Sequence, residues 1–279
     1  MNDGPIDLVM EAFGTAPEVE IAYRAALARF ETVLDELCSE LALLRQRASE
    51  HSTMPKGRVA QRMFEAVMPY ASETFITPMA AVAGSVAEEI LGSMSSAAIL
   101  SRAYVNDGGD IALHLESGQH FVVGLVERRE TPSLFGAVRL DSSQQILGIA
   151  TSGWRGRSFS LGIADAVTVL ASTASMADAA ATIIANAVDL SGNAKIGRVP
   201  ACEISPDSDL GDLLVTQSVE ALTITEIREA LAGGISKAEN LRALGLISAA
   251  ALHLQGETRI VGPQFVAEPE IAHWSLTHA

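Results

Sequence analysis

The chain has 279 residues, of which 48% are hydrophobic and 19% charged, a composition typical of a globular protein rather than a disordered one. Its net charge of −15 repels phosphate backbones and anionic lipid, so we expect neither nucleic acid nor a membrane surface as a partner. The only two cysteines, Cys38 and Cys202, predict no disulfide framework and no zinc site, which favours the reduced cytoplasm.

The first third of the chain is predicted to be largely helical. Its opening residues, MNDGPIDLVMEAFG, lack the basic start and apolar run of a signal peptide. Apolar side chains recur every three or four positions over 17–47, which predicts one long helix. This helix could pair with a second subunit, giving a homodimer, or pack on its own domain. A second helix is expected at 58–68, ending before Pro69.

A third helix is predicted to begin after Pro78, with Thr77 as its N-cap. Its first turns carry the small residues Ala80, Ala81, Ala83 and Gly84. Such residues permit very close approach by another backbone or by a flat ligand.

From residue 101 the hydrophobic period changes to two, which indicates strands. The candidates follow one another too closely for intervening helices, so the sheet is predicted to be mainly antiparallel and the fold α+β. The expected strands are 103–105, 111–115, 120–127, 135–140, 146–151 and 165–171.

The rest of the chain is predicted to alternate between helices and strands. Asp165 and Asp178 divide the apolar stretch 163–188, leaving less than the roughly 18 residues of a membrane span. The elements expected after residue 171 are a helix at 174–188, strands at 199–204 and 213–219, helices at 225–232 and 236–244 joined by Gly233-Gly234, and a hairpin of 248–254 with 258–261 turning at Gln255-Gly256. We divide the chain into an N-terminal helical segment (1–54), a core (55–220) and a C-terminal helix pair with hairpin (221–279).

Three separated segments are candidates for one small-molecule site. The chain contains no G-x-S-x-G, H-E-x-x-H, Walker A or G-x-G-x-x-G pattern, so a standard serine or zinc hydrolase is not supported. The first segment is 106–110, Asn-Asp-Gly-Gly-Asp. Gly108 and Gly109 either form a plain hairpin turn or present backbone N–H groups to a ligand, beside Asp107 and Asp110.

The second segment, 151–157, follows an apolar strand and is either an anion-binding loop or an exposed loop with surface ion pairs. It contains hydroxyls, two glycines and two arginines, with Trp154 as a stacking or lid residue. In so acidic a protein, Arg155 and Arg157 are local positive charges suited to a phosphate or carboxylate, so we expect an anionic ligand.

The third segment is 177–182, where Asp178 and Thr182 share one helix face. A carboxylate and a hydroxyl one turn apart are oxygen ligands of the kind that Mg²⁺ or Ca²⁺ takes. In the alternative interpretation, Ser175 and Asp178 form a capping box at the start of their own helix. Asp165 is a further carboxylate expected to face the same space.

These segments together resemble the ApbE-like superfamily, which contains the FAD:protein FMN transferases. The motifs are NDGGDI (106–111), ATSGWRGRSFSLG (150–162) and ADAVTVLASTASMADAAAT (164–182). FITPMAAVAGSVAEEIL (75–91) and RVPACEISPDSDLGDLLVT (198–216) are similar to the compact, non-lipoprotein branch of the superfamily, which is uncharacterised.

The resemblance implies an ApbE-like α+β fold with a cleft that binds FAD or FMN. It implies Mg²⁺ ligands at Asp178 and Thr182. It also implies a cofactor pocket lined by Gly108, Gly109, Asp110, Thr151 and Ser152. Further candidates for cofactor binding are Gly153, Arg155, Arg157, Thr77 and Met79. Candidates for catalytic groups are Asp107, Asp110, Ser152 and Asp165. One departure from the transferases is the missing His-His-Ile type segment, because Gly162 leads almost directly to the strand at 165.

Three functions follow from these observations. The first is a flavin-binding enzyme that uses Mg²⁺ to hydrolyse FAD or to transfer FMN. The second is a flavin-independent hydrolase or related catabolic enzyme that acts on a small carboxylated, heterocyclic metabolite in the same cleft. The third is a non-catalytic oligomeric interaction protein.

Overall fold

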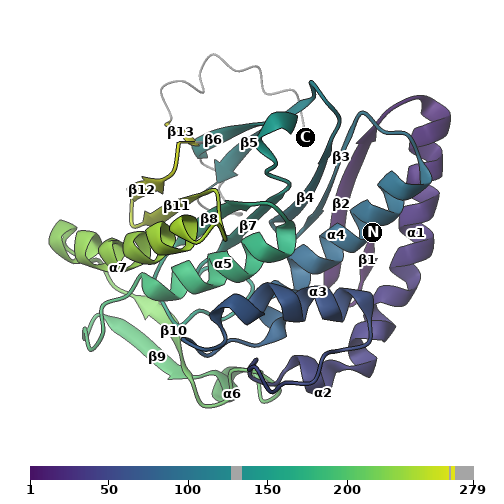
Figure 1. Ribbon diagram of the computed structural model, residues 1–279. Helices are drawn as coiled ribbons and strands as arrows, with labels where there is room; N and C mark the ends of the chain where they lie inside the picture. The colour runs from purple at the N-terminus through teal and green to yellow at the C-terminus, as the bar shows by residue number, and fades with distance from the viewer. Residues whose placement is uncertain (127–133, 264, 268–279) are drawn as a thin grey trace.

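The computed structural model describes residues 1–126, 134–263 and 265–267 and has three layers (Figure 1). The central layer is an eight-stranded sheet of order β1-β2-β3-β4-β7-β8-β11-β12, in which every strand pair is antiparallel. The strands are β1 (Asn2–Asp3), β2 (Ile6–Phe13), β3 (Arg102–Asp107), β4 (Asp110–Leu115), β5 (His120–Val126), β6 (Leu134–Asp141), β7 (Gly148–Ser152), β8 (Ala166–Ala171), β9 (Ile196–Pro200), β10 (Leu214–Val219), β11 (Ala249–Leu254), β12 (Glu257–Val261) and β13 (Phe265–Ala267).

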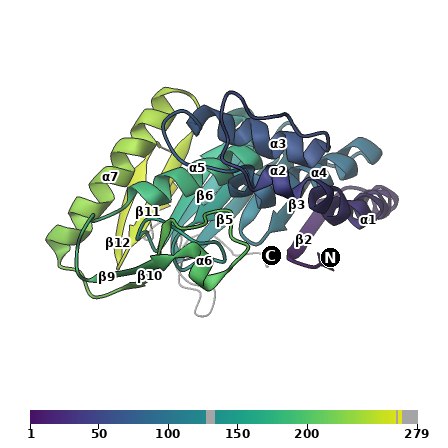
Figure 2. The same cartoon turned by 90° about the horizontal axis from the view of Figure 1, so that it is seen from below.

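Helices cover one face of the large sheet, as the view from below shows (Figure 2). The helices are α1 (Ala16–Ser39), α2 (Leu41–Leu44), α3 (Arg58–Val67), α4 (Val82–Ala97), α5 (Ala174–Ala187), α6 (Ala201–Ile204) and α7 (Ile224–Ala243), with short 3₁₀ turns at Met68–Tyr70, Pro78–Ala81 and Ser142–Gln144. The short α6 lies beside β9 and β10, outside this layer (Figure 1). The small sheet β13-β6-β5 packs on the other face, where Leu140 and Val138 share a core with Ile149 and Leu170. The α+β class and the mainly antiparallel sheet are therefore confirmed.

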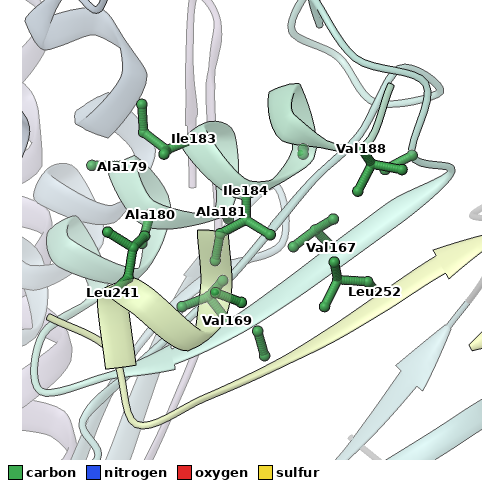
Figure 3. Close-up of a cluster of buried hydrophobic side chains, with 14 of the residues drawn as sticks. Val167, Val169, Ala179, Ala180, Ala181, Ile183, Ile184, Val188, Leu241 and Leu252 are labelled. Atoms are coloured by element: carbon green, nitrogen blue, oxygen red, sulfur yellow. The ribbon is translucent and has the colours of Figure 1, made fainter. Parts of the chain in front are cut away.

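The core between sheet and helices is built largely from small side chains. On α5, the alanines at 177, 179, 180 and 181 are fully buried, and they let this helix lie close to β8 and α7. Larger apolar groups fill the remaining space, as Figure 3 shows for Val167 and Val169 of β8, Ile184 of α5 and Leu252 of β11. Close packing of α5 matters because this helix carries Asp178 and Thr182.

The N-terminal segment differs from the prediction in two ways. Residues 6–13 form β2, which pairs with β3 inside the large sheet and was not expected. The long helix is confirmed, but α1 ends at Ser39, where the Glu40 carboxylate turns to accept hydrogen bonds from the N–H groups of Lys56 and Gly57 at 2.7 Å each. The buried face of α1 packs on α4 of the same chain. The pairing of α1 with a second subunit stays a prediction.

The C-terminal half contains two corrections. Strand 199–204 is wrong in its second half, where residues 201–204 form the helical turn α6. The two short helices at 225–232 and 236–244 are one continuous helix, α7. Gly233 and Gly234 lie inside this helix and do not form a linker. They allow α7 to contact Ala187 and Val188 closely.

The hairpin with its turn at Gln255-Gly256 is confirmed, since both residues have positive φ, 43° and 87°. Strand 120–127 ends at Val126, and residue 127 lies outside the described residues. The predicted segments 1–54 and 221–279 both contribute strands to the large sheet, and part of the latter segment, 264 and 268–279, also lies outside the described residues. Along the described chain, no helix has the length and hydropathy that crossing a bilayer requires.

Candidate functional site

The β3–β4 corner brings two carboxylates to one end of the large sheet. Asp107 ends β3, Asp110 begins β4, and the two are paired directly across the hairpin. Between them, Gly108 and Gly109 have φ of 67° and 121°, values that other residues rarely adopt. The Gly109 N–H donates to Oδ1 of Asn106 at 2.8 Å. The hairpin-turn interpretation is therefore confirmed, and the Gly109 N–H is used inside the turn rather than by a ligand.

Both carboxylates are on the helix-covered face of the sheet. Side chains alternate along a strand, and Ala103 and Val105 of β3 belong to the core beneath α1 and α4. Asp107 continues that alternation and is only 6% exposed, and Asp110 shares its face with the buried Ala112. The two acids thus point toward the helix layer, where α4 and α5 lie.

The end of β7 is joined to this corner through the backbone. The Thr151 N–H donates to Oδ1 of Asp110 at 3.1 Å, which ties the second segment to the first. The Thr151 hydroxyl shares a hydrogen bond of 2.9 Å with that of Thr168, its direct partner on β8. Ser152 is the last residue of the strand and is half-buried. Thr151 therefore contributes its backbone to the corner, while its side chain is held within the sheet.

Asp165 organises the loop after β7. A Cβ on Gly153 would lie 2.4 Å from the carbonyl oxygen of Asp165, so this close contact requires glycine. The Asp165 carboxylate accepts from Nε of Arg155 at 2.6 Å, from Nε1 of Trp154 at 3.2 Å and from the backbone N–H of Gln255 at 2.6 Å. With both oxygens occupied, Asp165 holds the loop in shape. Its contacts do not support the predicted role of general base.

The two arginines of this loop have different environments. Arg155 is fixed by Asp165 and its guanidinium stacks on the Trp154 ring, 4.4 Å from the centroid. Arg157 is exposed, and its positive charge acts on Asp107. Arg157 is therefore the arginine that the structure relates to the β3–β4 corner.

Helix α5 presents Asp178 away from its own N-terminus. The N-cap is Thr173, whose hydroxyl accepts from the Met176 N–H at 3.3 Å, and Glu88 of α4 accepts from the Ser175 N–H at 2.6 Å. The capping-box interpretation is therefore wrong, because the first turn of α5 has other acceptors. Oδ2 of Asp178 instead accepts from the Gly84 N–H at 3.0 Å, in the first turn of α4.

Asp107, Asp110 and Asp178 form what we call the acidic cluster. Burial raises the pKa of Asp107 to about 6, although the Asp7 N–H, at 3.4 Å, and the charge of Arg157 oppose this shift. The pKa of Asp178 is raised well above its ordinary value, mainly by burial and further by the negative charges of Asp110 and Asp107. The cluster therefore favours the uptake of a proton or a cation.

Asp178 and Thr182 carry oxygen donors of the kind that Mg²⁺ takes. In the described part of the chain, no three His, Cys, Asp or Glu groups are close enough to hold a metal by themselves. Magnesium in proteins is commonly held by one or two carboxylates together with substrate phosphates and water. One oxygen of Asp178 is bound to Gly84, and Thr182 lies one turn further along the same helix. These oxygen donors suit Mg²⁺ once phosphate oxygens complete its coordination.

Two of the predicted cofactor contacts, Thr77 and Met79, lie just before α4. Thr77 is buried and occupies the N-cap position of the 3₁₀ turn, but its hydroxyl donates to Asp209 instead of capping the turn. Met79 packs against the core beneath α4. The structure therefore gives both side chains protein contacts.

Two hollows on the helix side are lined by none of the predicted site residues. One, of about 300 Å³, is between α3 and the start of α5, and the other is between Tyr70 and α7.

Gly84 is the site residue whose role sequence reasoning missed. The run of small residues before it indicated close approach, and the group that approaches is the backbone of Ala174, not a flat ligand. Its second role, as donor to Asp178, depends on a contact between residues 94 positions apart. No local pattern contains that information.

Comparison with known proteins gives a family match and several relatives. A family model described as AbpE bacteria matches residues 1–260. A UPF0280 protein of Methanopyrus kandleri is 40% identical over 129 residues, covering 46% of this chain and 48% of that protein. A UPF0280 protein of Archaeoglobus fulgidus is 33% identical over 168 residues, covering 60% and 66%. The chain thus spans roughly half to two thirds of the length of these relatives.

Among solved structures, the chain is similar to the apo form of the flavinyl transferase ApbE of Pseudomonas stutzeri. The identity is 11%, the TM-score is 0.37, and the match covers 91% of this chain and 74% of that one. A likeness of that size supports no functional argument. The family match over residues 1–260 confirms the predicted resemblance, and the chain belongs to the family described as AbpE bacteria.

Proposed function

We propose that this protein is an enzyme acting on a flavin nucleotide, with Mg²⁺ held at Asp178 and Thr182, that hydrolyses the FAD pyrophosphate or transfers FMN. The observation that carries the proposal is the placement of Asp178. Its carboxylate is free of its own helix start and lies close enough to Asp110 and Asp107 for their charges to raise its pKa. Membership of the AbpE bacteria family supports the same direction.

A pyrophosphate would need positive charge in this part of the protein, since the acidic cluster alone repels it. Mg²⁺, when bound, would neutralise part of the phosphate charge and stabilise the leaving phosphate. Arg157, whose charge already acts on Asp107, and the outer nitrogens of Arg155 are the cationic groups of the 151–157 segment, which the Thr151–Asp110 hydrogen bond joins to the corner. The indole of Trp154, covered on one side by Arg155, offers a surface for stacking.

Proton transfer falls to Asp107 in this proposal. A carboxyl with a pKa of about 6 is largely ionised at neutral pH and can accept a proton from water. In hydrolysis, water adds to one phosphorus, the bridging P–O bond breaks, and the products are FMN and AMP. In transfer, a hydroxyl of an acceptor protein takes the place of water. Ser152, at the end of β7, stays a candidate for orienting the nucleophile.

The direct test is calorimetric titration of the protein with FAD in the presence and absence of Mg²⁺, followed by chromatography for FMN and AMP. We expect Mg²⁺-dependent binding and product formation in the wild type, and loss of the Mg²⁺ dependence in Asp178→Asn and Thr182→Val. Asp35→Asn, an exposed carboxylate on α1, is the matched control. Absence of FAD binding with and without Mg²⁺ would overturn the proposal.

A second candidate function is a flavin-independent hydrolase acting on a small carboxylated, heterocyclic metabolite. The observation that favours it is the positive charge of Arg157 acting on Asp107, since an exposed arginine in the field of a carboxyl of pKa about 6 suits a carboxylated substrate and a general base. Arg157→Ala distinguishes the two functions. If it leaves FAD binding intact but removes activity on carboxylated heterocycles, the second function holds. If it weakens FAD binding, the first does.

A further inference from the structure

The hollow between α3 and the start of α5 has the dimensions of a binding site. Its volume is about 300 Å³, at the lower end of the range for small-molecule pockets, which is roughly 300–1,000 Å³. Its walls come from α3, from the segment after it that ends at Tyr70, from the first turn of α5 and from Leu246. Asp107, Asp110 and Asp178 do not line it, so it is separate from the acidic cluster.

Tyr70 gives this hollow a polar group that a ligand can contact. The side chain is only 6% exposed and lines both hollows on the helix side. In the part of the chain that the structure describes, its hydroxyl makes no hydrogen bond, and burial alone raises its pKa. The hydroxyl is not among the buried side-chain atoms that lack a partner, so it is open to the hollow and is available to donate or accept a hydrogen bond there.

The charged side chains at the hollow carry a net negative charge. Arg62 is neutralised by Glu88, at 2.9 Å from its Nε, and by Glu89, at 3.2 Å from its Nη1. Glu88 also accepts from the Ser175 N–H. Glu65 lines the hollow, is exposed, and forms no ion pair with another described residue. Because the whole chain also carries a charge of −15, a cation is attracted to this place more than an anion is.

Apolar atoms form the rest of the wall, from Ala66 of α3, Met176 of α5 and Leu246. We infer that the hollow binds a small organic amine with an apolar body and a second polar group. The ammonium pairs with Glu65, the body packs between Ala66 and Met176, and the second polar group hydrogen-bonds to the Tyr70 hydroxyl. Glu65 and Tyr70 both line this one hollow, which suits a compact ligand with polar groups at both ends.

Three probes with one body test this inference by calorimetry or protein-observed NMR. Tyramine has both polar groups, 2-phenylethylamine lacks the hydroxyl, and 3-(4-hydroxyphenyl)propionate replaces the ammonium with a carboxylate. We expect tyramine to bind most tightly, 2-phenylethylamine about two- to fivefold more weakly, and the propionate not to bind. Tyr70→Phe should remove the difference between the two amines, and Glu65→Gln should weaken tyramine binding about two- to fivefold.

Glu229→Gln, an exposed carboxylate on α7 outside both hollows, is the matched control for charge and should leave tyramine binding unchanged. Asp178→Asn should also leave it unchanged, which separates this site from the proposed flavin site. Both Glu65→Gln and Tyr70→Phe are small changes whose folding is checked by thermal melting. Equal binding of tyramine and the propionate, or no saturation of any probe at millimolar concentration, would mean that the hollow holds water only.

Discussion

Oδ2 of Asp178 accepts a hydrogen bond from the backbone N–H of Gly84 at 3.0 Å, so a side chain of α5 caps the first turn of α4. The two helices can approach this closely because Gly84 has no Cβ. A Cβ there would lie 2.4 Å from the carbonyl oxygen of Ala174. Gly84 thus permits the helix contact and donates to the carboxylate. The position of Asp178 therefore depends on how α4 and α5 pack as much as on its own helix.

We predict that Gly84→Ala destabilises the protein by about 1–3 kcal/mol, because the added Cβ meets backbone that cannot move aside without separating the helices. Gly92→Ala is the control on the same helix, since its Cβ would meet nothing within 4 Å. That change should stabilise the protein by about 0.5–1 kcal/mol through helix propensity. Urea unfolding of both variants measures the difference, and equal effects would contradict the close contact.

Because of the acidic cluster, we predict that folding stability depends on pH with a sign opposite to that produced by most carboxylates in ion pairs. Because the pKa of folded Asp107 is about 6 and that of an unfolded aspartate is near 4, the folded state binds more protons between these values. Stability from this group is complete below about pH 4 and is lost as pH rises through about 6. The loss is at most about 3 kcal/mol, and the raised pKa of Asp178 acts in the same direction.

Asp107→Asn isolates this effect, because the amide has the same shape and does not titrate. The stability of the variant relative to the wild type should increase as pH rises from about 4 to about 7. Urea unfolding at several pH values measures it, with Asp35→Asn, exposed on α1, as the control. A constant difference across this range would show that Asp107 is not buried in the folded state.

Sequence periodicity predicted the fold well where packing agrees with local preference. β3 alternates between buried and half-buried residues, and β8 and β11 are short apolar runs buried at every position, so each of these patterns is local. β2 was missed because its IDLVMEAF stretch alternates only in part and is recognisable as a strand mainly through its pairing with β3. The break between α1 and α2 also depends on a distant contact, from Glu40 to the start of α3.

For the candidate site, the sequence predicted which segments come together better than what each residue contacts. The Thr151–Asp110 hydrogen bond and the charges acting on Asp178 join the three segments. Gln255, one partner of Asp165, and Asp209, the partner of Thr77, lie 90 and 132 positions away in sequence. Spacing along the chain has no information about such distant partners.

The continuous helix α7 gives a further prediction about glycine. Alanine normally stabilises a helix interior relative to glycine by about 1 kcal/mol. At Gly234, however, a Cβ would lie 2.4 Å from Cγ2 of Val188 and 2.6 Å from Cδ2 of Leu252, and at Gly233 it would lie 2.5 Å from the carbonyl oxygen of Ala187. We therefore expect Gly233→Ala and Gly234→Ala to lower the free energy of unfolding by about 1–3 kcal/mol in urea titrations. A stabilising effect would indicate a flexible Gly-Gly linker.

Variants of Asp165 distinguish a role in holding the loop after β7 in shape from a role as a general base in the reaction. Its partners Trp154, Arg155 and Gln255 would lose their acceptor in Asp165→Ala, and we expect a loss of about 2–4 kcal/mol in urea unfolding. Arg155→Ala should cost less, because the Arg155 side chain is 38% exposed and the vacated carboxylate keeps two donors.

Asp165→Asn keeps the shape of the side chain and is the variant for kinetic measurements. If Asp165 only orders the loop, turnover per folded molecule changes little in that variant. A loss of turnover of about a hundredfold or more with unchanged stability would instead make Asp165 a general base.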